Sequence, residues 1–194
     1  MNADTENKTL QTTEYPDKTK FYVYEKAKEI LGETKPMRIL LPDAILLLLY
    51  AQPDNPIFGR VSLMKQVYLL TKEVLNRDEV QDARFVPYYY GWYSFQVIND
   101  VRNLEFLGYL TRKGKTNSTS EQFQISQKGK KHINKIFSTL SESLQTTIKE
   151  KRKGWDQLGC EGILRYMYTK YPESKERARL KERYKTIKWG RSRG

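Results

Sequence analysis

The chain of 194 residues contains one cysteine, Cys160, and one histidine, His132. A single cysteine excludes a disulfide within the chain and is typical of proteins from reducing compartments. His132 has no cysteine or histidine at the spacing of metal ligands, so no metal site is expected. Cys160 lacks a nearby histidine that would activate it, and we expect a small buried residue. A glycine-rich phosphate loop is also missing. Together, these absences predict a protein that is not an enzyme and uses no cofactor.

Long hydrophobic runs are also lacking. The most apolar run, residues 39–50, is interrupted by Pro42 and Asp43 and is too short to span a bilayer. The first twenty residues are polar and contain no apolar core of the signal-peptide kind. We therefore expect a cytoplasmic protein with no membrane contact.

Positive charge, by contrast, is abundant and unevenly placed. The net charge is +12. Residues 111–131 contain six basic residues and one acidic residue, and residues 170–194 contain ten basic and three acidic residues. These two segments together carry the whole net charge. Such concentration favours a polyanionic partner, although two solvated basic faces are the alternative interpretation.

Hydrophobic periodicity predicts the helices of the first half of the chain. We expect disorder over residues 1–20, a helix over 21–31 and a helix buried on all sides over 43–52. A further helix over residues 62–76 would begin at Ser62 as its cap. The polar residues expected on the solvent side of this last helix are Lys65, Gln66, Lys72 and Glu73.

An aromatic segment, residues 85–93, precedes the most informative part of the chain. Its aromatic side chains could stack on unpaired bases, or they could lie in a strand with one face in the core. We expect about half of them in the core, with a turn at Gly91 that directs the helix that follows.

Residues 94–131 predict a helix followed by a hairpin. Ser94 would cap the helix and Gly108 would end it. Two short strands, 109–112 and 123–125, flank a polar basic tip. The inner face of the helix is expected to contain Val97, Ile98, Val101, Leu104 and Leu107.

The last third of the chain is expected to be helical. A long helix would run from its cap at Ser126 to residue 149, with a break at residues 151–154. A second helix would cover residues 155–171 and end at Pro172. The basic residues beyond could form a helix that folds on nucleic acid, a helix that docks on a protein, or a solvated terminus.

Three helices followed by a hairpin is the order of a winged helix, in which the third helix enters the major groove and the hairpin follows the backbone. The sequence therefore predicts a mainly α (α+β) fold. We expect a winged-helix core over residues 21–126 with a β-hairpin wing, a helical extension over 127–172 packed on the core, and a basic tail over 173–194.

Side chains suited to nucleic acid gather in the helix, the wing and the tail. Asn, Gln and Arg recognise base edges, while Lys and Arg neutralise phosphates. This predicts duplex DNA binding and transcriptional regulation, with RNA or a protein as alternative partners and a homodimer left open. The candidate nucleic-acid-binding residues are Arg60, Ser94, Gln96, Asn99, Arg102, Asn103, Arg112, Lys113, Lys115, Lys128, Lys130, Lys131, Arg177, Lys181, Lys185 and Lys188.

Five segments in order resemble one protein family. They read ILLLLYAQ, GRVSLMKQVYLL, FVPYYYGWYSFQVINDVRNLEFLGYL, FQISQKGKK and GILRYMYTKYP. Over residues 41–172 the chain resembles the Panacea and YwgA-like group, which includes the SocA-like antitoxins. The resemblance implies a winged-helix-like domain with a C-terminal helical extension, no established catalysis, and a role as antitoxin or adaptor for a protein partner.

Two motifs carry this resemblance, and two departures qualify it. The aromatic-glycine turn of the family matches Tyr88, Tyr90, Gly91, Tyr93 and Ser94, and its basic-then-apolar helix matches Arg60, Leu63, Lys65 and Gln66. This chain has Trp92 where the family often has proline, and its long basic tail is not required by the family pattern. Both departures leave room for a dedicated contact with nucleic acid.

Overall fold

The computed structural model describes residues 12–14, 20–22, 39–75 and 80–175. The chain divides into two units, Met1–Met37 and Arg38–Gly194. In the first unit, β1 (Thr12–Glu14) pairs with β2 (Lys20–Tyr22) in antiparallel register. The sequence predicts disorder up to residue 20 and a helix from residue 21, whereas the structure has strands at residues 12–14 and 20–22. The rest of the expected helix lies outside the described residues.

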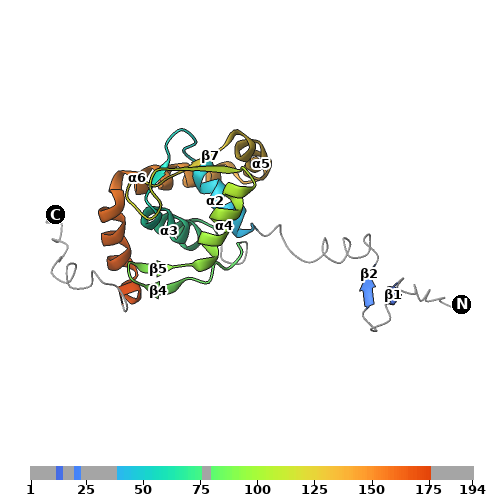
Figure 1. Cartoon of the computed structure of the whole chain (residues 1–194), viewed down its shortest axis with the longest axis horizontal. Helices are drawn as coiled ribbons and strands as arrows, with labels where there is room; N and C mark the ends of the chain where they lie inside the picture. The colour runs from blue at the N-terminus through green and yellow to red at the C-terminus, as the bar shows by residue number, and fades with distance from the viewer. Residues whose placement is uncertain (1–11, 15–19, 23–38, 76–79, 176–194) are drawn as a thin grey trace, which may run out of the picture. The chain divides into compact units, whose positions relative to one another are not determined.

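The second unit is mainly helical with small sheets, as the sequence predicts. Its described residues contain helices that alternate with short strands, and Figure 1 shows their arrangement. In chain order the elements are α2 (Leu41–Tyr50), β3 (Ile57–Phe58), α3 (Arg60–Leu69), the π-helix η1 (Leu70–Val74), β4 (Val86–Tyr88), β5 (Gly91–Tyr93), α4 (Phe95–Phe106), β6 (Leu110–Lys113), β7 (Gln122–Ile125), α5 (Gln127–Phe137), α6 (Glu142–Lys170) and the 3-10 helix η2 (Pro172–Lys175).

The strands of this unit form two separate sheets. Strands β3, β7 and β6 make a three-stranded antiparallel sheet in that order, with β7 in the centre. Strands β4 and β5 form a hairpin of their own. The predicted hairpin is confirmed to within one residue at each strand. Strand β3, which joins it through the pair Ile57 and Phe123, was not predicted because two residues give no readable alternation.

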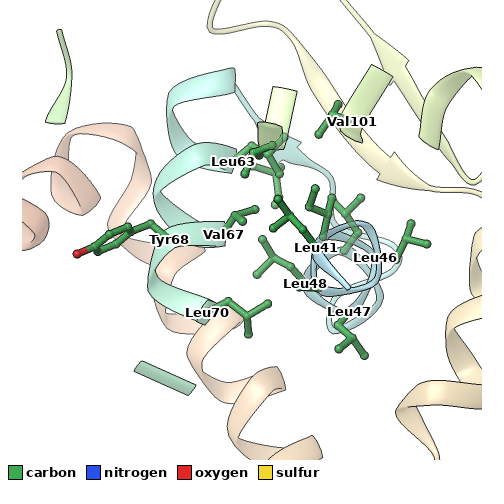
Figure 2. Close-up of a cluster of buried hydrophobic side chains, with 14 of the residues drawn as sticks. Leu41, Leu46, Leu47, Leu48, Leu63, Val67, Tyr68, Leu70 and Val101 are labelled. Atoms are coloured by element: carbon green, nitrogen blue, oxygen red, sulfur yellow. The ribbon is translucent and has the colours of Figure 1, made fainter. Parts of the chain in front are cut away.

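Helix α2 occupies the centre of the core, as its run of leucines predicts. Pro42 lies in the first turn, where its missing N–H is not needed. All of the residues from Ala44 to Leu49 are buried, so the helix has no solvent face. In Figure 2, Leu46 and Leu47 point from α2 toward different neighbours, and Leu48 points toward α3.

Helix α3 differs from expectation in its start and in its burial. It begins at Arg60, after Gly59 adopts a φ of +79° that favours glycine, and Ser62 is buried inside the first turn instead of capping it. Figure 2 shows Val67 pointing toward α2 and Tyr68 pointing to the opposite side. That opposite side packs against α6 and β5. Lys65 is therefore buried, which corrects the expected solvent exposure of this face.

Helix α4 begins and ends where the sequence predicts. The Oγ of Ser94 accepts a hydrogen bond from the N–H of Val97 at 3.1 Å, and the chain leaves the helix at Gly108 with a φ of +74°. Four of the expected inner residues are buried. Leu107 is 50% exposed, because it caps the helix and points away from the core beyond the last full turn.

The two C-terminal helices break at other places than expected. Helix α5 ends at Phe137, and α6 begins after Ser141, whose Oγ accepts from the N–H of Leu144 at 3.3 Å. Helix α6 then runs through residues 151–154 without a break, held by buried Arg152 and Trp155. It bends at Gly159, with a φ of +62°, so that its two arms run in different directions in Figure 1.

The helical extension shares one core with the rest of the second unit. Ile133 and Phe137 of α5, together with Ile148 and Met167 of α6, belong to the same cluster of buried side chains as α2 and α3. Among the described residues, no helix combines the length and the apolar character needed to cross a membrane.

Candidate functional site

The outward side of α4 carries the polar residues that the sequence singled out. Asn99, Arg102 and Asn103 are exposed, and Gln96 is half-buried. Their spacing places them on one side of the helix, opposite the buried residues. The structure therefore brings these four candidate residues together on one accessible surface, which we call the α4 face.

Two exposed phenylalanines flank the α4 face. Phe95 in the first turn is 60% exposed, and Phe106 in the last turn is 91% exposed. Phe95 contacts the ring of Tyr93, with the ring centroids 5.0 Å apart. Sequence reasoning did not single out either phenylalanine, although the period of the helix places both on its outward side.

Ser94 differs from the other candidate residues. Its side chain is fully buried, caps α4 and donates a hydrogen bond to the carbonyl oxygen of Ala83. It therefore positions α4 and does not reach a ligand. Four further candidates, Arg177, Lys181, Lys185 and Lys188, lie outside the described residues.

Both candidate arginines near the β6–β7 hairpin are engaged with one acidic residue. Glu121 is fully buried, and its Oε1 lies 3.1 Å from Nη2 of Arg60 and 3.4 Å from Nη1 of Arg112. Its Oε2 accepts from the N–H of Asn117 at 3.0 Å. Arg112 also pairs with Glu105 of α4 at 2.9 Å. Glu121 thus ties the hairpin tip to α3, and Arg112 ties the hairpin to α4.

The candidate lysines divide into engaged and available ones. Lys128 donates to the carbonyl oxygen of Leu107 at 2.7 Å, and Lys130 lies 3.3 Å from Oδ1 of Asp54. The remaining candidates, Lys113, Lys115 and Lys131, are exposed and form no ion pair within the described part of the chain.

A cavity of about 860 Å³ lies where the start of α3, the β4–β5 hairpin, the β6–β7 tip and the bend of α6 meet. Sequence reasoning missed it, because its walls come from segments far apart in the chain. Cys160 lines this cavity and is exposed, which corrects the expected burial. Gly159, the residue before Cys160, bends α6. The regular side-chain packing of the helix is interrupted at this bend.

Lys65 lies in the cavity wall and has no carboxylate partner among the residues that the structure describes. Lys65 is buried, and its Nζ donates to the carbonyl oxygen of Trp92 at 2.5 Å. Burial lowers the pKa of Lys65 to about 7, and the nearby Cys160 offsets part of this effect. The contact holds the β4–β5 hairpin against α3.

The aromatic segment is divided between the core and the cavity. Phe85, Trp92 and Tyr93 pack against the core, and Trp92 stacks on Tyr68 with ring centroids 5.6 Å apart. Tyr89 and Tyr90 are exposed at the hairpin turn and line the cavity. The prediction of half in the core is confirmed.

Within the residues that the structure covers, no three His, Cys, Asp or Glu side chains gather in positions to hold a metal ion. His132 is exposed, and its Nε2 lies 3.1 Å from Oδ1 of Asp43. The sequence matches no known protein-family model and none of the curated proteins. Membership of the Panacea and YwgA-like group stays a prediction.

Proposed function

We propose that the chain is a cytoplasmic winged-helix protein that binds duplex DNA without catalysing a reaction. The order of α2, β3, α3, α4, β6 and β7 supports this proposal, since winged helices use the same order of helices and strands. The sheet order β3, β7, β6 agrees with it, because the strand between the first two helices lies beside the last strand of the wing. The β4–β5 hairpin is then an insertion before the third helix.

The observation that carries the proposal is the pairing of the α4 face with a basic wing. Arg112 of β6 ties the wing to α4, because it pairs with Glu105 of that helix. In the proposed complex, α4 enters the major groove. Asn99 and Asn103 match the donor and acceptor pattern of adenine, and Arg102 matches that of guanine.

In the proposed complex, phosphate contacts fall to the lysines that are not engaged within the described part of the protein. Lys113, Lys115 and Lys131 are the exposed candidates that remain after the internal ion pairs and the hydrogen bond of Lys128 are counted. Three neutralised phosphates predict a slope of about −2.7 for the logarithm of affinity against the logarithm of salt concentration. Arg60 and Arg112 hold the wing in place, since Glu121 already engages both guanidinium groups.

The experiment measures binding of the full chain to a mixed-sequence DNA duplex by fluorescence anisotropy across a salt series. The variant K113E/K115E should weaken binding at least tenfold and flatten the salt slope by about two. The matched control is K151E/K153E, which makes the same charge change on two exposed residues of α6. Equal losses in the two variants would contradict the wing assignment.

A protein-binding role is the second candidate, favoured by Phe95 and Phe106. Exposed phenylalanines at both ends of one helix side provide the apolar anchors that protein interfaces use. An antitoxin or adaptor role, to which the tail could add contacts, belongs to this candidate. The variant F106S should abolish capture of one stoichiometric protein partner from the source cell in nuclease-treated extract, and should leave DNA affinity within twofold. If F106S lost DNA binding but still captured the protein partner, the result would count against the protein-binding role.

A further inference from the structure

The cavity has the size and composition of a small-molecule site. Its volume of about 860 Å³ lies in the range of ligand pockets, which are mostly apolar with a few convergent polar groups. The bend at Gly159 shapes one wall, because it lets Cys160 and Leu164 of α6 border the space. No residue of the α4 face lines the cavity, so it is distinct from the proposed DNA surface.

Aromatic rings form much of its wall. Tyr88 and Tyr90 come from the β4–β5 hairpin, Phe58 from β3 and Trp155 from α6. Phe58 and Tyr90 are exposed, so their rings are available for contact. Aromatic side chains arranged in this way offer flat faces on which another planar ring stacks.

One polar group in the wall requires a hydrogen-bond donor. Gln66 is almost fully buried and lines the cavity, and its Nε2 donates to Oδ1 of Asp156 at 3.0 Å. The carboxylate of Asp156 also accepts from Asn55 at 3.0 Å and pairs with Arg152. A reversed amide would place Oε1 against this carboxylate, so the network fixes its orientation. The buried Oε1 of Gln66 has no partner in the described part of the protein.

A second polar group requires an acceptor. Arg60 lines the cavity, and its Nε is buried without a partner among the described residues, whereas its Nη2 binds Glu121. An unsatisfied buried donor or acceptor is destabilising, and a ligand with the complementary group satisfies it. The site therefore calls for a ligand with N–H donors, acceptors and a planar ring.

We infer that this cavity binds a nucleobase, supplied either by a free nucleotide or by an unpaired base of a polynucleotide. A nucleobase carries donors and acceptors on the edge of a flat ring, which matches Gln66, Arg60 and the tyrosine rings together. A peptide backbone also has donors and acceptors, but it has no ring to place against Tyr88 and Tyr90. This inference does not rest on the proposed contact of α4 with DNA.

The direct test titrates the full chain with AMP, GMP, CMP and UMP by calorimetry, with ribose 5-phosphate as the base-free control. A short single-stranded oligonucleotide identifies the source of the base. Saturable binding of at least one mononucleotide, with none of ribose 5-phosphate, supports a free nucleotide. Binding of the oligonucleotide alone supports an unpaired base in a polynucleotide. No binding of any base-containing probe at millimolar concentration, or equal binding of ribose 5-phosphate, overturns the inference.

Two variants on one hairpin locate the site. Tyr90→Ala removes a ring from the cavity wall, and it should weaken nucleobase binding about five- to 150-fold if stacking is worth about 1–3 kcal/mol. Val86→Ala is the matched control, because Val86 is equally exposed on the same hairpin and does not line the cavity. The wing variant K113E/K115E should keep full nucleotide affinity. Equal effects of Tyr90→Ala and Val86→Ala would overturn the location.

The single cysteine allows a test of the cavity in the wild-type protein. Cys160 is exposed at the cavity and is the only thiol of the chain. A saturating nucleobase ligand should slow its alkylation by N-ethylmaleimide at least fivefold, and the alkylated protein should lose nucleobase binding. Treatment with the reagent should not change the nucleobase affinity of Cys160→Ser, which has no thiol to alkylate. An unchanged alkylation rate at saturation would contradict binding in this cavity.

Discussion

Glu121, at the tip of the β6–β7 hairpin, lies 3.1 Å from Arg60 at the start of α3 although the two residues are 61 positions apart. The carboxylate has no exposure to solvent, and Arg112 approaches it from the neighbouring strand at 3.4 Å. The hairpin is therefore fixed to the helical core through one buried acidic group. A wing held in this way has a defined direction before it meets a ligand.

Replacing Glu121 should loosen this connection. Glu121→Gln removes the negative charge that two arginines share, and we expect the free energy of unfolding to fall by about 1–3 kcal/mol. Urea denaturation measures the change. Glu161→Gln is the control, because its pair with Arg165 is about half exposed and should contribute less than about 1 kcal/mol. A loss at Glu121 no larger than at Glu161 would show that the buried contact does not hold the hairpin.

Lys65 should make stability depend on pH. Its pKa is about 7 in the folded chain, whereas the ordinary pKa of a solvated lysine is 10.5. Between these values the unfolded state binds more protons, so this residue makes the free energy of unfolding rise with pH. From pH 7 to pH 9 this residue should raise the free energy of unfolding by about 2 kcal/mol, and Lys65→Met should lack this increase.

The measurement compares urea denaturation of the wild type and Lys65→Met at pH 7 and pH 9. The variant no longer buries an ammonium group. We therefore expect the difference in free energy of unfolding between Lys65→Met and the wild type to favour the variant most at pH 7 and less at pH 9. All other titrating groups are common to both proteins. A difference that stays constant across this range would mean that Lys65 titrates at its ordinary pKa in the folded protein.

Two glycines of α6 should respond in opposite directions to alanine. Gly159 has a φ of +62°, and a Cβ there would meet no atom within 4 Å, so only backbone strain opposes the substitution. We expect Gly159→Ala to lower the free energy of unfolding by about 1–2 kcal/mol. Gly154 lies inside the helix and also has open space around it, so Gly154→Ala should stabilise the protein by about 0.5–1 kcal/mol. Thermal denaturation distinguishes the two variants. An increase in stability for both of them would contradict a bend at Gly159.

A cluster around Glu73 should hold the end of α6 to the π-helix η1. The hydroxyls of Tyr166 and Tyr171 donate to this carboxylate at 3.0 Å and 2.8 Å, and Lys170 lies 2.9 Å away. Burial and Glu73 raise the pKa of Tyr171 above its ordinary value. Tyr171→Phe should lower the free energy of unfolding by about 1 kcal/mol. In a double-mutant cycle with Glu73→Gln, the coupling should be at least about 0.5 kcal/mol.

Local signals in the sequence predicted the elements that depend on local chemistry. The leucines of α2, the cap at Ser94 and the stop at Gly108 all act within one or two helical turns, and the structure confirms each of them. The β6–β7 hairpin follows equally from alternation and a polar tip. Its position after three helices could therefore be predicted without knowledge of long-range packing.

Long-range packing explains what the sequence did not reveal. Lys65 has the pattern of an outward residue, but α6 and the β4–β5 hairpin cover it. A break was expected at residues 151–154, but α6 bends at Gly159 instead, because burial of Arg152 and Trp155 favours continuation of the helix through Gly154. The cavity joins four separate parts of the chain, and no local pattern records that they meet.

The three-stranded sheet has consequences for self-association. One edge is β3, which has two residues and follows directly after Pro56, and the other edge is β6, which ends in Arg112 and Lys113. A short strand beside a proline offers few backbone groups to a second chain, and two basic edges placed together repel each other. Growth of this sheet by addition of a second copy is therefore disfavoured on both sides. A dimer of this protein is therefore not expected to form by pairing the edges of this sheet.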